Sequence, residues 1–162
     1  MDIFYIKTEI FNILKKGSEQ SALGRYIIEY AAKNHYNIEN SELEIINNKP
    51  KFKYSDVNFS ISHTDGLVAV CFDENPVGFD VEKIKKRNYK AIANRMNFDM
   101  KKDSPEEFYR CWCEYEAEYK LQAKQKKVCS QIFLKDYMMS VCTAADKIGE
   151  LNFYQVNFKK EN

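Results

Sequence analysis

The chain has 162 residues, with 25 Lys and Arg against 24 Asp and Glu and a formal net charge of +1. This length can bury a core in one or two compact units, and the near-neutral charge excludes the global electrostatic signature of a nucleic-acid-binding protein. The five cysteines are odd in number and show no Cys-x-x-Cys spacing, so we expect reduced thiols and neither a disulfide framework nor a zinc site.

The first half of the chain alternates short apolar stretches with polar turns. The expected strands of this half cover residues 2–7, 42–46, 52–54, 57–62 and 67–72. The expected helices cover residues 9–16, closed by Gly17, and 21–34, capped by Ser21. A turn at residues 47–50 separates the second and third strands, and the last two strands are expected to pair across residues 64–66.

The next strand follows a polar turn and reads Gly-Phe-Asp-Val-Glu over residues 78–82. Strand alternation sends Asp80 and Glu82 to one face, while Phe79 and Val81 point the other way, into a core. Two neighbouring carboxylates repel each other unless a cation lies between them. Mg²⁺ is typically held by a few carboxylates together with phosphate oxygens and water. This strand therefore predicts a cation-dependent site.

The second half continues with helical patterns and ends in strands. A helix is expected over residues 89–96, and Ser104-Pro105 with Glu107 predicts the start of another. In that helix Glu116 and Lys120 are four residues apart and share one face. Residues 137–143 and 151–158 are β-rich, and no Gly-, Ser- or Pro-rich linker divides the chain. We expect one α+β body of two lobes that divide near residue 75.

Four segments, taken in chain order, resemble the 4′-phosphopantetheinyl transferases. They are Asn48-Lys49-Pro50, Phe-Ser-Ile-Ser-His at residues 59–63, Gly-Phe-Asp-Val-Glu at 78–82 and Trp-x-x-x-Glu-Ala-x-x-Lys at 112–120. The resemblance spans about residues 22–143. Within the family, the chain most resembles the single-chain, surfactin-synthetase-activating branch. It implies a pseudo-dimer of two similar α+β lobes, with residues 1–75 as the N-terminal lobe and 76–162 as the C-terminal lobe that carries the carboxylates.

The resemblance also implies roles for the acidic residues and the helix lysine. Asp80, Glu82 and Glu116 would hold Mg²⁺ against the pyrophosphate of coenzyme A. Glu116 would also act as the base that activates the acceptor serine. Lys120 matches the family lysine that reaches the pyrophosphate, and it is expected to act in both catalysis and coenzyme binding.

The remaining matched residues are implied to bind coenzyme A. Lys49 matches a segment that lies against the nucleotide end of the coenzyme. Ser62 and His63 match the segment that contacts its phosphates, and an imidazole donor beside phosphate is reasonable chemistry.

These features lead to one main hypothesis and two alternatives. The main hypothesis is Mg²⁺-dependent transfer of 4′-phosphopantetheine from coenzyme A to a serine of an acyl or peptidyl carrier protein. The basic runs of the chain after Glu82 and after Leu121 suit a carrier protein that is acidic around its serine. Tyr115 and Gln20 replace a lysine and an arginine that the family tends to have, so a non-catalytic relative that binds coenzyme A or the carrier stays open. A general metal-dependent phosphoryl-transfer or hydrolytic protein is a third class.

The expected setting of the protein follows from what its sequence lacks. No apolar run is long enough to span a bilayer, and the start of the chain lacks the charged and apolar regions of a signal peptide. We expect a cytoplasmic monomer without nucleic-acid or membrane partners.

Overall fold

The computed structural model describes residues 1–8 and 18–158. Within these residues the fold is α+β, with three helices and nine strands. In chain order the elements are β1 (Asp2–Lys7), α1 (Ser18–Asn34), β2 (Leu43–Ile46), β3 (Lys49–Phe52), β4 (Asn58–Thr64), β5 (Leu67–Asp73), β6 (Val77–Lys83), α2 (Lys90–Met96), α3 (Pro105–Leu121), β7 (Lys127–Phe133), β8 (Tyr137–Thr143) and β9 (Asn152–Gln155).

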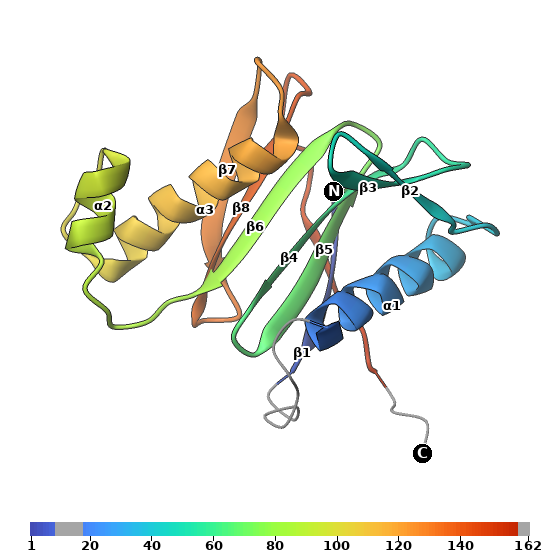
Figure 1. Cartoon of the computed structure of the whole chain (residues 1–162), viewed down its shortest axis with the longest axis horizontal. Helices are drawn as coiled ribbons and strands as arrows, with labels where there is room; N and C mark the ends of the chain where they lie inside the picture. The colour runs from blue at the N-terminus through green and yellow to red at the C-terminus, as the bar shows by residue number, and fades with distance from the viewer. Residues whose placement is uncertain (9–17, 159–162) are drawn as a thin grey trace.

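Two sheets form the body, and a long helix covers the outer side of each (Figure 1). The first sheet has the strand order β4-β5-β1-β9, and the second has the order β6-β8-β7. The β2–β3 hairpin is a separate ribbon. Apolar residues of α1 pack on the first sheet, whereas α3 packs on the second sheet through Ala117 and Leu121.

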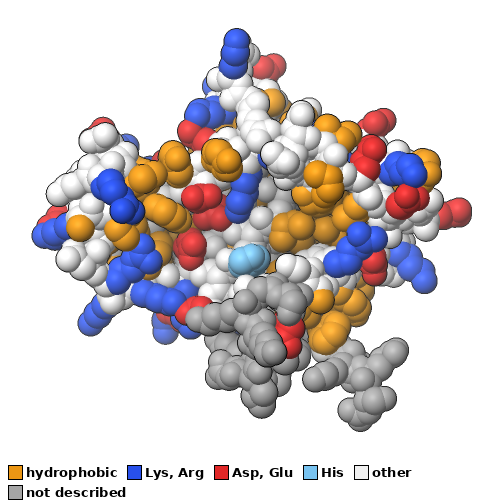
Figure 2. Space-filling view, viewed as in Figure 1, with side chains coloured by type: hydrophobic (Ala, Val, Ile, Leu, Met, Phe, Trp, Pro, Cys, Tyr) orange, Lys and Arg blue, Asp and Glu red, His pale blue; other side chains and the backbone are white. Residues whose placement is uncertain are grey.

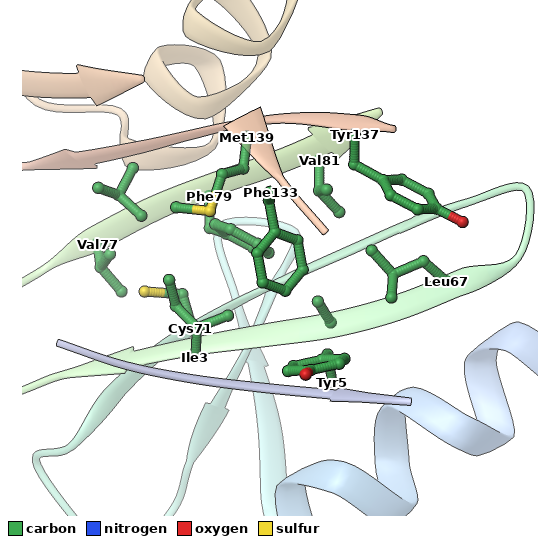
Figure 3. Packing of buried hydrophobic residues seen from close by; sticks show 12 residues of the cluster. Ile3, Tyr5, Leu67, Cys71, Val77, Phe79, Val81, Phe133, Tyr137 and Met139 are labelled. Atoms are coloured by element: carbon green, nitrogen blue, oxygen red, sulfur yellow. The ribbon is translucent and has the colours of Figure 1, made fainter. Parts of the chain in front are cut away.

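The space between the two sheets is filled by one apolar cluster (Figure 3). The first sheet contributes alternate residues of β1 and β5, and the second contributes alternate residues of β6 and β8 together with Phe133. Phe79 and Val81 are fully buried in this cluster, as strand alternation predicts. The opposite face of β6 is therefore turned toward α3.

The N-terminal elements follow the sequence prediction with two corrections. The strand expected over residues 2–7 is confirmed as β1, but α1 begins at Ser18, so the prediction of Ser21 as the helix cap is wrong. The turn between β2 and β3 consists of Asn47 and Asn48 alone, whose φ values are 50° and 62°. Asparagine tolerates this left-handed backbone. The helix expected over residues 9–16 lies outside the described residues.

The narrower turn places Lys49 on strand β3 (Lys49–Phe52), so the bounds expected for this strand, residues 52–54, are wrong: it begins three residues earlier and ends at Phe52. The pairing of β4 with β5 is confirmed, and it runs from Asn58 opposite Asp73 to Thr64 opposite Leu67.

The start of α3 is confirmed, with one difference in its hydrogen bonds. Ser104 caps the helix by accepting the Glu107 backbone N–H at 3.2 Å. The Glu107 carboxylate accepts the backbone N–H of Lys101 at 3.0 Å and pairs with Arg110 at 2.7 Å, while the Ser104 N–H donates to the Lys102 carbonyl. The capping box is thus half formed, because an arginine one turn on competes for the carboxylate.

The end of the chain holds two features that local patterns did not predict. Strand β7 pairs antiparallel with β8, and β9 pairs parallel with β1. The last strand therefore belongs to the same sheet as the first strand. The division into lobes at residue 75 stays a prediction.

All five cysteines carry free thiols, and four of them are buried. Among the described helices, none is long and apolar enough to cross a membrane.

Candidate active site

Strand β6 carries the two predicted carboxylates on the face that meets α3. Asp80 is 5% exposed and Glu82 is half-buried. Figure 2 shows acidic and basic side chains gathered beside a histidine near the middle of one molecular face. The carboxylates are thus placed at a partly dry position where two sheets and a helix meet.

A row of hydroxyl groups joins β4 to β6. The hydroxyls of Ser60, Ser62 and Thr64 accept the backbone N–H groups of Phe79, Val81 and Lys83, at 3.0, 3.2 and 3.2 Å respectively. Residue numbers rise together along both strands, so the two strands run in the same direction. Because side chains replace carbonyl acceptors here, the two sheets meet at this seam without forming one continuous ladder.

Two of these hydroxyls also bind the carboxylates. Ser62 donates to Asp80 Oδ1 at 2.7 Å, and Thr64 donates to Glu82 Oε2 at 2.7 Å. Each hydroxyl therefore satisfies a backbone donor and a carboxylate at once. Ser62 was expected to contact coenzyme phosphates, and that role stays a prediction. Thr64 was not predicted, although the alternation of hydroxyl residues along β4 is a signal that could have revealed it.

Helix α3 brings Lys120 to the same carboxylate. The Lys120 ammonium donates to Asp80 Oδ1 at 2.7 Å and to the Phe79 carbonyl at 3.0 Å. Helix and strand approach closely because residue 78 is glycine: a Cβ there would lie 2.0 Å from the Ala117 carbonyl oxygen. This contact sets the position, relative to β6, of Glu116, which precedes Ala117, and of Lys120, which lies three residues after it.

The charges of the site perturb one another. Burial raises the pKa of Glu82, and the Asp80 charge adds to this effect, while the Thr64 hydrogen bond, Lys120 and Arg87 oppose it. Burial also raises the pKa of Glu116, again with a contribution from Asp80 and opposition from Lys120. Both glutamates therefore lie close enough to Asp80 to respond to its charge.

The carboxylates have the donor chemistry of a divalent-cation site. Asp80 Oδ2 is buried and has no hydrogen-bond partner at normal distance among the described residues, although the Cys113 thiol lies near enough to Asp80 for the carboxylate to raise the thiol's pKa. A buried oxygen without a hydrogen bond is left unsatisfied unless a ligand binds it, and carboxylate oxygens are the donors that Mg²⁺ prefers. In the described part of the chain, no group of three or more His, Cys, Asp or Glu side chains is arranged to hold a metal ion. The convergence of Asp80, Glu82 and Glu116 on one ion stays a prediction.

A cleft beside these residues is lined by lysines. It measures about 200 Å³ and lies between β3, β4, β6 and α3, with Lys49 and Lys120 in its wall. Partial burial lowers the pKa of Lys49, and the charges of Lys51 and Lys120 lower it further. Lys49 forms no ion pair with any described residue. A second cleft of about 520 Å³ shares Lys49 and Pro50 and continues along the hairpin.

His63 leaves β4 on the opposite side from its neighbours Ser62 and Thr64. It is exposed, whereas both neighbours are buried. The imidazole of His63 therefore projects from the other face of β4 than the hydroxyls of Ser62 and Thr64, and its coenzyme role stays a prediction.

Tyr115, which replaces the lysine of the resembled family, is 45% exposed. Its ring lies 6.5 Å from the Trp112 ring and 6.1 Å from the Phe98 ring, measured between centroids. The tyrosine ring therefore contacts two aromatic rings at the rim of α3 while much of it stays exposed, next in sequence to Glu116.

Comparison with known proteins gives one relative to report. No family model matches the chain. The chain is 36% identical over 86 residues to a protein of Haemophilus influenzae (strain ATCC 51907 / DSM 11121 / KW20 / Rd) named "Putative 4'-phosphopantetheinyl transferase". The match covers 46% of this chain and 37% of that protein, so the chain spans well under half of the relative's length. This distant similarity supports the phosphopantetheinyl transferase superfamily, which the sequence motifs also resemble.

Proposed function

We propose that the chain is a phosphopantetheinyl transferase of the single-chain branch, which transfers the 4′-phosphopantetheine group of coenzyme A to a serine of an acyl or peptidyl carrier protein. One observation carries this proposal. Among the described residues, one buried oxygen of Asp80 accepts no hydrogen bond and Lys49 forms no ion pair, and Lys120, which binds the other Asp80 oxygen, lines a cleft together with Lys49. A cation and a phosphate group are the ligands that such neighbouring groups attract together.

Carboxylate oxygens are the kind of donor that Mg²⁺ prefers, and Asp80, Glu82 and Glu116 are the residues that would hold it. When bound, Mg²⁺ would neutralise charge on the pyrophosphate and on the leaving 3′,5′-ADP.

Side chains of the protein itself would bind the phosphates, accept the proton and orient the carboxylates. Lys49 and Lys120 bind the phosphates and offset their negative charge. Glu116 accepts the proton of the carrier serine. The serine oxygen then forms a bond to the phosphorus of the phosphopantetheine group, and the bond from that phosphorus to 3′,5′-ADP breaks. Ser62 and Thr64 hold the carboxylates in place through their hydroxyls.

Mass spectrometry of a carrier protein tests this function. Apo carrier proteins of fatty-acid, polyketide and peptide type are incubated with the chain, coenzyme A and Mg²⁺. We expect one of them to gain the mass of phosphopantetheine, and chelation of the metal to prevent the gain. Asp80→Ala should slow transfer on the order of a hundredfold or more. Lys147→Ala, which changes an exposed residue between β8 and β9, serves as the control.

Ligand binding separates the proposal from its alternative, a non-catalytic relative. That alternative is favoured by Tyr115, whose packed ring brings no positive charge to the site. Binding of coenzyme A without transfer to any carrier would support it. Lys49→Ala and His63→Ala should weaken coenzyme A binding more than pantetheine binding, because pantetheine has no phosphate. Equal losses for both ligands would show that these residues act through folding.

A further inference from the structure

Lys120 occupies the position of a cation at the buried carboxylate. Its ammonium lies 2.7 Å from Asp80 Oδ1, an oxygen that also accepts the Ser62 hydroxyl, while Oδ2 has no hydrogen-bond partner at normal distance in the described part of the chain. The Asp80 side chain is 7% exposed and the Lys120 side chain is 26% exposed. The ion pair is therefore partly shielded from water, and its attraction is stronger than that of a surface pair.

A divalent cation that bound Asp80 alone would lie a few ångströms from this ammonium. Like charges at that separation repel strongly in a partly buried site. The repulsion falls only if the lysine moves or if an anion joins the site. Lysine is suited to such a movement, because its ammonium is a compact charge on a flexible stem. Lys120 also lines the cleft of about 200 Å³ that it shares with Lys49, so a phosphate bound there would offer the ammonium a second partner.

We infer that Lys120 is a mobile counter-ion that couples the two ligands of the site: it neutralises Asp80 when the site is empty and turns to the phosphate of an incoming ligand, which opens Asp80 to a divalent cation. The inference rests on the proposed function, because the anion and cation are those of the transferase. By linkage, each ligand raises the affinity for the other by the same factor.

The inference predicts opposite changes in two affinities when the lysine charge is removed. In Lys120→Gln, Mn²⁺ without coenzyme should bind several-fold more tightly, because no ammonium competes for Asp80. Coenzyme A without metal should bind more weakly, because a phosphate contact is lost. The coupling factor should be on the order of tenfold in the unaltered chain, within the usual range for linked sites, and should fall to about one in the variant.

The experiment needs no turnover and no carrier protein. Free Mn²⁺ is measured by electron paramagnetic resonance during titrations of the chain with and without saturating coenzyme A, and protein-free mixtures correct for Mn²⁺ held by the coenzyme itself. Lys124→Gln is the matched control, since it removes the same charge from an exposed residue just beyond α3. It should keep the coupling of the unaltered chain.

The outcomes separate this inference from the function beneath it. Unchanged Mn²⁺ affinity in Lys120→Gln would show that the lysine only contacts phosphate, and weaker binding of both ligands with a lower melting temperature would show a structural role. Either result overturns the inference and leaves the transferase standing. A chain that binds both ligands without coupling also overturns the inference alone. A chain that binds neither ligand overturns the inference and the proposed function together.

Discussion

Alanine at position 78 would place a methyl carbon between β6 and α3, where the structure leaves no room. The new carbon would lie 2.0 Å from the Ala117 carbonyl oxygen and 2.7 Å from the Leu121 backbone nitrogen. Both are helix backbone atoms, so no change of side-chain rotamer relieves the clash. The helix must therefore move away from the strand, and it carries Glu116 and Lys120 with it.

The size of this movement follows from contact distances. A carbon and a carbonyl oxygen approach to about 3.3 Å at closest, so α3 has to retreat by more than about 1 Å. Overpacking of this kind costs about 1–3 kcal/mol and sometimes more. For a chain of this size, that cost lowers the melting temperature by roughly 2–12 °C. Displacing catalytic groups by about 1 Å can slow a reaction on the order of a hundredfold.

Gly24 supplies the matched control for Gly78→Ala. A Cβ at Gly24 would lie 3.4 Å from Ile61 Cγ2 and 4.0 Å from Val68 Cγ1, which are ordinary contacts. In the interior of α1, alanine favours the helix by about 1 kcal/mol over glycine. Gly24→Ala should therefore keep or raise the melting temperature and preserve coenzyme A binding and transfer, whereas Gly78→Ala should lower all three. A Gly78→Ala chain that melts early but binds metal and coenzyme normally would refute the link between this contact and the site.

Three further perturbations test the seam, the rim and the helix start. Thr64→Val removes the donor to Glu82 and leaves the partly buried backbone N–H of Lys83 without its acceptor. The free energy of unfolding in urea should therefore fall by about 1–3 kcal/mol, and Mn²⁺ should bind less tightly. Unchanged values for both would contradict the proposed role of the Thr64 hydroxyl between β4 and β6. Tyr115→Lys should lower the melting temperature through lost ring contacts without tightening coenzyme A binding, whereas tighter binding that weakens with salt would reveal a site short of positive charge. Hydrogen bonds from Arg110 lower the pKa of Glu107 from 4.5 to about 2. The stability that this pair contributes is therefore complete above pH 4.5 and is lost as the pH falls toward about 2. Urea unfolding across this pH window should show that the free energy of unfolding falls less steeply in Glu107→Gln than in the unaltered chain.

The strand arrangement around the site was predictable because it depends on local alternation. Phe79 and Val81 face the core and Asp80 faces α3, as period-two spacing requires. The pairing of β9 with β1 was not predictable, because it joins the two ends of the chain and leaves no signal in either segment. Strand β7 was missed because much of it is exposed and its sequence mixes polar with apolar residues.

The site itself was only partly visible in the sequence. The family resemblance brought Asp80 and Lys120 to one site, and their contact at 2.7 Å agrees with that grouping. Neither residue's spacing could show that the lysine would pair with the carboxylate. Thr64 was missed because its role depends on strand β6 lying beside β4, which is a tertiary contact. The need for Gly78 likewise appears only when α3 is placed against β6.

Strand β6 makes the electrostatics of the site depend on how the two sheets pack. Its inner side chains fill the core between the sheets, its N–H groups bind the hydroxyls of β4, and its outer carboxylates bind two of those same hydroxyls. A shift of one sheet along the other would break the hydrogen bond from Ser62 to Asp80 and that from Thr64 to Glu82 together. The Thr64 hydrogen bond opposes the raised pKa of Glu82, and losing a donor raises the pKa of a carboxyl, so such a shift would weaken Glu82 as a cation ligand. The apolar core between the sheets therefore maintains the hydrogen bonds of both carboxylates as well as the shape of the site.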